Sequence, residues 1–125
     1  MTAWTAWTAD ELTRIGDADE VQIAFRRRDG SLSTPRIVWV VRDGDALYVR
    51  SVNGRDSAWF RGVQARHEGH LRGGGVEHDI AFVEAEPDAG ALDAAYRTKY
   101  GRYPGPVAHI TAAGARAATL AVEPR

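Results

Sequence analysis

Hydrophobic and polar positions alternate with a period of two along much of the chain, a pattern that predicts half-buried strands. The first such segment has Val21, Ile23 and Phe25 alternating with Gln22, Ala24 and Arg26. Residues 37–41, Ile-Val-Trp-Val-Val, are continuously apolar and rich in β-branched side chains. Such a run favours a strand covered on both faces. We therefore expect residues 36–42 to form one strand, with 37–41 as the most buried stretch of the fold.

Turn signals divide the chain into further strands. They are Asp29-Gly30, Asp43-Gly44-Asp45, Asn53-Gly54 and Gly73-Gly74-Gly75. Asp-Gly and Asn-Gly pairs between apolar segments are strong hairpin and turn signals. The strands that we expect between and after these turns are 47–52, one beginning at 70, 76–85, and a last pair at 108–111 and 115–122.

Three segments carry helix signals. Thr8 and Glu11 have the spacing of a capping box and begin a short amphipathic helix that ends at Gly16-Asp17. A second helix is expected over residues 57–67, capped by Asp56 or Ser57. A third begins after Pro87-Asp88 and ends at Gly101, with an apolar side formed by Leu92, Ala95, Tyr96 and Tyr100. Pro104-Gly105-Pro106 is interpreted as a rigid turn before the last strands.

The resulting order is one helix, three strands, a helix, two strands, a helix and two strands. Because most connections are hairpins, the sheet should be antiparallel. Six or seven strands in so short a chain close most economically as a barrel, which removes exposed edges. The fold class expected is mainly β (α+β), an antiparallel barrel with short flanking helices. Residues 1–125 are expected to form a single domain, with 1–8 as a frayed N-terminal segment.

Composition limits the kinds of site, the cellular location and the partners that we expect. The chain has no cysteine, so disulfides and thiolate metal sites are excluded. The absence of cysteine fits a reducing cytoplasm, which is the expected location. A net charge of −1 gives no global attraction to nucleic acid or to anionic membranes. No apolar run is long enough to cross a bilayer, so we expect neither a nucleic-acid nor a membrane partner.

The segment from Pro35 to Arg66 resembles the flavin-type split-barrel superfamily. The residues that carry the resemblance are Arg36-Ile-Val-Trp-Val-Val and Leu47-Tyr-Val-Arg50-Ser51-Val-Asn53-Gly54-Arg55-Asp56-Ser57-Ala-Trp59-Phe60-Arg61. The superfamily includes pyridoxamine phosphate oxidases and deazaflavin-dependent nitroreductases, and the chain looks closest to an uncharacterised bacterial branch. The chain lacks the long C-terminal extension of the oxidases. It has Arg50 and Arg55 where the nitroreductases usually carry lysine and glycine-rich spacing.

The turn that contains Arg50, Ser51, Asn53, Gly54 and Arg55 leads directly into an expected helix start. Free backbone N–H groups at a helix N-terminus favour anions, and arginine matches phosphate oxygens with a planar fork. The other reading is a solvated corner with two exposed arginines, in which Asp56 caps the helix. In the split-barrel relatives this turn holds the cofactor phosphate, so the resemblance implies a phosphate site here.

Three further residues belong to the predicted cofactor site. By the resemblance, Arg36 would face the phosphate or the ribityl chain of the cofactor. Trp59 and Arg61 lie near the same turn, where Arg61 is able to reach a ligand and Trp59 is more readily explained by packing. Trp39 is interpreted mainly as a core residue, because aromatic side chains at strand spacing are usually core.

An aromatic and basic cluster ends the third helix, at Tyr96, Lys99, Tyr100, Arg102 and Tyr103. Two interpretations remain equal: the mouth of a pocket or a subunit contact, and a helix that covers one barrel end with its tyrosine tips in water. The histidines have no metal-ligand spacing, since His67 and His70 are three apart with Gly69 between them.

The function hypothesis is an oxidoreductase-like protein that binds FMN, or alternatively a deazaflavin coenzyme, and acts on an unknown small molecule. The resemblance also implies a homodimer. Such a cofactor carries the redox chemistry itself, which fits a sequence in which no acid, base or nucleophile stands out. The alternative is a cofactor-free barrel that binds a small molecule, or a cyclase or isomerase that uses the same pocket. The arginine-rich turn favours the cofactor.

Overall fold

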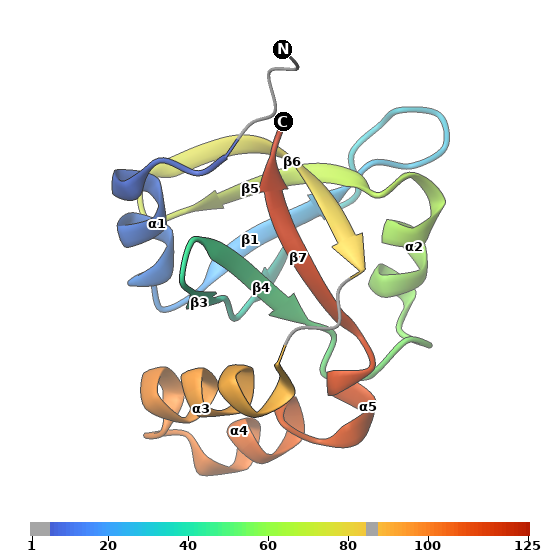
Figure 1. Ribbon diagram of the computed structural model, residues 1–125. Helices are drawn as coiled ribbons and strands as arrows, with labels where there is room; N and C mark the ends of the chain where they lie inside the picture. The colour runs from blue at the N-terminus through green and yellow to red at the C-terminus, as the bar shows by residue number, and fades with distance from the viewer. Residues whose placement is uncertain (1–5, 85–87) are drawn as a thin grey trace.

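The computed structural model describes residues 6–84 and 88–125. Within them, seven strands form one antiparallel sheet, in agreement with the six or seven strands expected. The strands are β1 (Val21–Phe25), β2 (Arg36–Val38), β3 (Val41–Asp43), β4 (Ala46–Arg50), β5 (Glu68–Gly73), β6 (Val76–Glu84) and β7 (Thr119–Pro124). Their order is β2-β1-β5-β6-β7-β4-β3, and the sheet curls into a split barrel (Figure 1). The predicted fold class is confirmed.

The period of two in the sequence decides which side chains face the barrel interior. In β4, Leu47 and Val49 are fully buried inside the barrel with Ile23 of β1 and Leu120 of β7. Side chains of neighbouring residues in a strand point to opposite faces. Tyr48 and Arg50 therefore lie on the outer face of β4. This alternation places a charged residue, Arg50, outside the apolar interior.

In the described part of the chain, the helices that cover the sheet are α1 (Ala9–Gly16), α2 (Ala58–Arg66), α3 (Ala89–Tyr100), α4 (Pro104–Ile110) and α5 (Ala113–Arg116). In the view of Figure 1, α1 and α2 lie on opposite sides of the barrel, and α3, α4 and α5 lie together below it. The capping box of Thr8 and Glu11 is present as predicted. Ser57, rather than Asp56, caps α2. A second apolar cluster packs α3 and α4 against Val41 of β3.

The prediction of one buried strand over residues 36–42 is wrong. The segment divides into β2 and β3, which form the two opposite edges of the sheet. Ile37 is 61 % exposed, whereas Val40 is buried in the barrel and Val41 lies under α3. These apolar residues therefore lie in three different environments: solvent for Ile37, the barrel interior for Val40 and the contact with α3 for Val41. The chain passes from one sheet edge to the other through Trp39 and Val40.

The predicted turn at 104–106 and strand at 108–111 are also wrong. Residues 104–110 form α4, with proline in its first turn and with Val107 and Ile110 on its buried side. Proline is favoured in the first turn of a helix, because its missing N–H has no partner there in any case. The expected strand 115–122 begins instead as α5 and becomes β7 only at Thr119.

The N-terminal segment is only partly outside the fold. Residues 1–5 of the segment predicted to be frayed lie outside the described residues. Trp7 is 8 % exposed and packs in the barrel core, so the prediction is wrong for this residue. Its indole Nε1 donates a hydrogen bond of 2.8 Å to the carbonyl oxygen of Val122, which attaches the segment to β7. In the part of the chain that is described, no helix has the length and apolar character needed to cross a membrane.

Candidate functional site

A cleft of about 570 Å³ lies between the edge strand β2, the turn from β4 to α2, and helix α4. Its volume is within the range of about 300–1,000 Å³ typical of ligand pockets. The residues that line it are Arg36, Ile37, Val38, Trp39, Arg50, Val52, Asn53, Trp59, Pro106, His109 and Ile110. Four predicted site residues therefore come together here: Arg36, Arg50, Asn53 and Trp59.

The charged side chains that line the cleft are positive. Arg36 and Arg50 line it, and no aspartate or glutamate is among the described lining residues. The side chain of Arg36 is exposed and has no hydrogen-bond or ion-pair partner in residues 6–84 and 88–125. A concave surface lined by one sign of charge attracts ligands of the opposite sign. The cleft is suited to an anionic ligand.

Arg50 is the most deeply placed charge of the cleft, with an exposure of 3 %. Its Nε donates to the hydroxyl of Thr119 over 3.1 Å, and its Nη1 donates to Asp93 over 2.6 Å and to the carbonyl oxygen of Ile110 over 3.1 Å. Nη2 donates to no described residue. Since Arg50 lines the cleft, Nη2 is the terminal nitrogen that remains for a ligand.

Asp93 of α3 holds Arg50 in place. One carboxylate oxygen accepts from Arg50, and the other accepts from Nε and Nη2 of Arg116 in α5. Burial alone would raise the pKa of Asp93, but the hydrogen bonds from Arg50 and Arg116 lower the pKa below its usual value. One buried carboxylate is thus shared by two guanidinium groups, which leaves a net positive charge beside the cleft.

The turn between β4 and α2 is held by its own hydrogen bonds. The hydroxyl of Ser51 is fully buried and donates to the carbonyl oxygen of Gly54, and it also contacts the hydroxyl of Ser57. Gly54 has a φ of +80°, which disfavours any residue with a side chain. Neither residue lines the cleft, so they shape the turn that presents Asn53 to it.

The structure does not bring Arg55 and Arg61 to the cleft. Arg55 forms an ion pair of 2.7 Å with Glu84, donates to the carbonyl oxygen of Ala117 and covers the ring of Phe60. The pKa of Glu84 is lowered, chiefly by its hydrogen bond from Arg55. Arg61 is exposed on α2 and is absent from the cleft lining. The two arginines of this turn therefore have different surroundings: Arg50 lines the cleft, and Arg55 is paired with Glu84 outside it.

Two tryptophans form aromatic walls of the cleft. Trp39 stacks on Tyr100 of α3, with ring centroids 3.9 Å apart and an angle of 3° between the ring planes. Trp59 lies in the first turn of α2, half-buried beside Phe60. Trp39 thus combines the predicted packing role with a place in the cleft wall. Flat aromatic side chains are suited to packing against a planar ring.

The contribution of α4 and of Asp93 to the cleft was not predicted from the sequence. Pro106, His109 and Ile110 line the cleft from α4, a segment for which the sequence predicts a turn and a strand. The spacing of Val107 and Ile110, three residues apart after a proline, was the available helix signal. No local pattern distinguishes Asp93 from the exposed acidic residues, because its partners are distant in the sequence.

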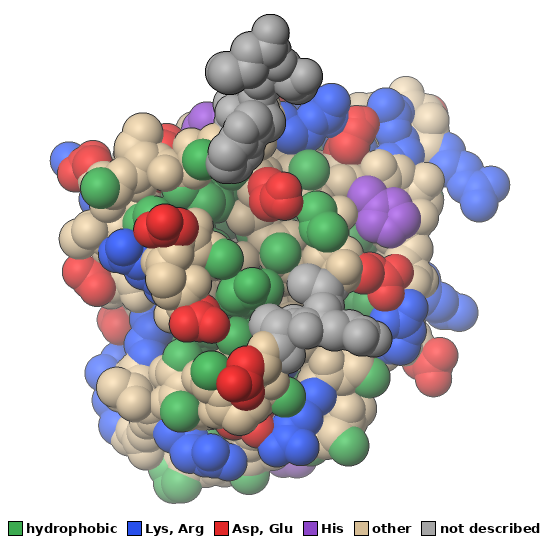
Figure 2. All heavy atoms as spheres, viewed as in Figure 1, with side chains coloured by type: hydrophobic (Ala, Val, Ile, Leu, Met, Phe, Trp, Pro, Cys, Tyr) green, Lys and Arg blue, Asp and Glu red, His purple; other side chains and the backbone are tan. Residues whose placement is uncertain are grey.

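A second groove differs in charge. It has a volume of about 270 Å³ and is lined by Ala6, Trp7, Asp45, Ala46, Leu47, Tyr48, Ala121, Val122, Glu123 and Pro124. Figure 2 shows apolar side chains gathered at the centre of this face, with acidic side chains around them. The described lining contains two acidic residues and no arginine or lysine. This groove is therefore less suited to an anionic ligand than the cleft.

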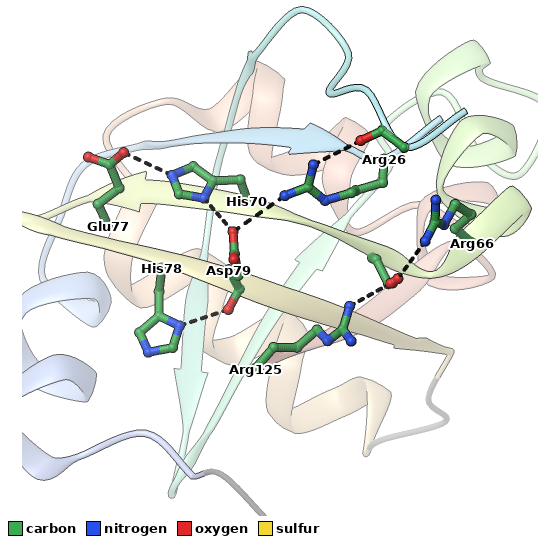
Figure 3. Close-up of polar contacts among 9 residues, drawn as sticks. Arg26, Arg66, His70, Glu77, His78, Asp79 and Arg125 are labelled. Atoms are coloured by element: carbon green, nitrogen blue, oxygen red, sulfur yellow. Dashed lines mark hydrogen bonds and ion pairs between the residues drawn. The ribbon is translucent and has the colours of Figure 1, made fainter. Parts of the chain in front are cut away.

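Figure 3 shows a cluster of charged side chains on β5 and β6. The two ring nitrogens of His70 lie 3.0 Å from the carboxylates of Glu77 and Asp79. The hydrogen bond from His70 is the main cause that lowers the pKa of Asp79. Arg125, at the end of β7, forms an ion pair with Glu68. None of these residues lines the cleft. The contacts of His70 join the neighbouring strands β5 and β6, and the ion pair of Arg125 links the residue after β7 to β5.

Solved structures with the same fold include three proteins with named ligands or activities. An F420-H2-dependent reductase is 14 % identical with a TM-score of 0.61, covering 84 % of this chain and 94 % of its own. HutZ, a heme storage protein from Vibrio cholerae, is 9 % identical with a TM-score of 0.61, covering 90 % and 86 %. The FAD- and heme-binding protein from Mycobacterium smegmatis is 18 % identical with a TM-score of 0.50, covering 92 % and 64 %. These similarities confirm the split-barrel fold.

The sequence itself matches one protein family. Residues 11–122 match the family described as "Uncharacterized protein conserved in bacteria (DUF2255)". This agrees with the expected uncharacterised bacterial branch of the superfamily. A comparison with curated proteins found no match.

Proposed function

The chain belongs to the bacterial family DUF2255, and we propose that it is an oxidoreductase-like protein that binds a flavin or deazaflavin cofactor in the cleft beside β2. The observation that carries this proposal is the buried Arg50, whose Nη2 has no partner among the described residues and which lines a cleft with tryptophan walls and no acidic residue in its described lining. The fold shared with an F420-dependent reductase and a FAD-binding protein supports it.

The residues present fit such a cofactor. Arg36, Arg50 and Asn53 would hold its phosphate, since arginine binds phosphate oxygens with charge-assisted hydrogen bonds. Trp39 and Trp59 would pack against its planar ring. The bound cofactor would supply the hydride or electron chemistry, while the protein binds and orients it and limits its contact with water. The sequence also suggested Arg55 as a phosphate ligand. Because Arg55 is paired with Glu84, we assign this contact to Arg36 instead.

Replacing Arg36 with alanine tests the phosphate site. We expect the affinity for FMN to fall about ten- to a hundredfold, because one charge-assisted hydrogen bond contributes roughly 1.5–3 kcal/mol. Riboflavin has no phosphate, so its affinity should change little. The matched control is Arg97→Ala, which removes an exposed arginine of α3 that does not line the cleft. Fluorescence titration of the wild-type protein and of both variants with each flavin gives the affinities to compare.

Titration with coenzyme F420 completes this experiment. Tighter binding of F420 than of FMN by the wild-type protein would select the deazaflavin, and the Arg36→Ala loss should then appear with F420. An equal loss for FMN and riboflavin would contradict a phosphate contact by Arg36. If the wild-type protein binds none of the three, the cofactor proposal is wrong, and a cofactor-free small-molecule barrel or isomerase takes its place.

We also propose that the protein is a homodimer of cytoplasmic location. Among the described strands, the edge strand β2 pairs only with β1, and Ile37 and Val52 on the rim of the cleft are 61 % and 48 % exposed. A free strand edge beside apolar side chains favours association with another chain. Light scattering at micromolar concentration should give twice the mass of the chain, and Ile37→Lys should shift it toward one chain. A monomeric wild-type protein would contradict this proposal.

A further inference from the structure

The two residues between β2 and β3, Trp39 and Val40, connect the two edges of the split sheet; we refer to them as the junction. Val40 is fully buried but is outside both strands. A buried backbone amide and carbonyl need hydrogen-bond partners. Here α3 provides them. The amide of Val40 donates to the hydroxyl of Tyr100 over 3.3 Å, and its carbonyl oxygen accepts from Nζ of Lys99 over 2.8 Å and from the Tyr100 hydroxyl over 3.3 Å.

The junction also determines the position of one wall of the cleft. Trp39 precedes Val40, stacks on the ring of Tyr100 and lines the cleft. On its other side, Trp39 and Tyr100 line a recess of about 220 Å³ together with Tyr103. Because Tyr100 is buried, the aromatic pair has a fixed support. The end of α3 is thus connected to the ligand-facing side of β2 through two side chains.

From these contacts we infer that Lys99 and Tyr100 are positioning residues, which fix the junction and so hold Trp39 and β2 in the conformation that binds the cofactor. The effect on the cofactor rests on the proposed function, whereas the effect on the junction does not. Neither residue is assigned contact with the cofactor. Of the two interpretations of the aromatic and basic cluster, the one with tyrosine tips in water is wrong for Tyr96 and Tyr100, which are buried. Both pack with Val41 of β3, and the inference gives Tyr100 and Lys99 a role in supporting the cleft.

The protonation of Lys99 gives a readout that is specific to this contact. Burial lowers the pKa of Lys99 to about 8, opposed by the charges of Asp17 and Asp19. Glu20 and Arg102 face Tyr100 from the other side. Burial also raises the pKa of Tyr100 to about 12, so its hydroxyl stays neutral while Lys99 loses its charge. An ammonium group donates a stronger hydrogen bond than a neutral amine. Above pH 8 the hydrogen bond from Lys99 to the carbonyl oxygen of Val40 should therefore weaken.

The stability of the protein should change in the opposite direction over the same range. The pKa of Lys99 in the folded protein lies below its ordinary value of 10.5. Between the two values the unfolded chain binds the proton and the folded protein does not, so the free energy of unfolding rises with pH through this group. A loss of affinity above pH 8 without a loss of stability separates a change at the junction from unfolding.

The first experiment needs no ligand. Hydrogen exchange of the Val40 amide, measured by NMR at pH 6.5, should be about five- to tenfold faster in Tyr100→Phe and in Lys99→Met. Tyr100→Phe removes the acceptor of the amide and one donor to the carbonyl oxygen, and Lys99→Met removes the other donor to the carbonyl oxygen that holds the junction. Lys99→Arg keeps a charged donor and should restore exchange to near the wild-type rate. Unchanged exchange in both Tyr100→Phe and Lys99→Met would overturn the inference.

The second experiment titrates FMN and F420 at pH 7 and at pH 9. Wild-type affinity should fall about three- to tenfold between these values, as a charge-assisted hydrogen bond becomes a neutral one. Lys99→Arg should show no such fall, and Lys99→Met should bind weakly at both values. A fall that persists in Lys99→Arg would contradict a role for Lys99. If the wild-type protein binds neither compound, the proposed function fails, and the exchange of Val40 still decides whether α3 fixes the junction.

Discussion

Asp93→Ala is expected to lower the free energy of unfolding by about 3–5 kcal/mol, because removing one partner of a buried ion pair leaves an uncompensated charge. The remaining contacts of Arg50, to Thr119 and to the carbonyl oxygen of Ile110, do not neutralise it. Both side chains of the pair are almost fully buried. Chemical denaturation of the wild-type and variant proteins gives the difference directly.

The pH dependence of stability provides a second measure of this pair. The pKa of Asp93 is lower in the folded protein than its ordinary value of 3.8. Its stabilising contribution is therefore fully present above pH 3.8 and is lost as the pH falls through the lowered pKa. Asp93→Asn should lack this acid-dependent loss. A wild-type curve identical in shape to that of Asp93→Asn would contradict the assignment.

Asp56→Ala is the matched control, since Asp56 is exposed and has no ion-pair partner within the described residues. Surface substitutions of this kind usually change stability by no more than about 0.5 kcal/mol. Arg116→Met removes the half-exposed partner of Asp93 and should have a smaller effect than Asp93→Ala, because the buried pair of Arg50 and Asp93 remains. Equal losses for Asp93→Ala and Asp56→Ala would show that the buried pair does not hold the fold.

Phe60→Ala is expected to lower the free energy of unfolding by about 3–5 kcal/mol, as large-to-small aromatic substitutions in cores do. Phe60 is fully buried and attaches α2 to the barrel core beside Val63. The guanidinium of Arg55 lies over its ring, 5.0 Å from the centroid. Because α2 presents Trp59 to the cleft, loosening this helix should also weaken cofactor binding. Thermal and chemical unfolding measure the first effect, and flavin titration measures the second.

Trp59→Ala separates these two effects. Trp59 is the neighbour of Phe60 on the same helix, but it is half-buried and lines the cleft. Its removal should reduce stability less than Phe60→Ala does. It should weaken the binding of FMN and of riboflavin alike, since both carry the same ring. A Phe60→Ala protein as stable as Trp59→Ala would contradict the anchoring role of Phe60.

The sequence by itself determined the features that depend on neighbouring residues. The capping box of Thr8 and Glu11 fixed the start of α1, because both hydrogen bonds join residues three apart. Gly54 and Gly74 mark turns with positive φ, a conformation that glycine adopts without strain. The alternation in β1 predicted that Val21 and Ile23 are buried. Antiparallel strands with such patterns, together with the resemblance at residues 35–66, were enough for the split barrel.

Only the tertiary structure decided where the apolar run at 37–41 and the arginines of the turn are placed. The run divides between two sheet edges, because Tyr100 and Lys99 satisfy the backbone of Val40 that a continuous strand would otherwise pair. Arg50 and Arg55 are five residues apart, yet Asp93 holds one beside the cleft and Glu84 holds the other away from it. These partners lie tens of residues away in the chain, so the choice depends on long-range packing and not on local pattern.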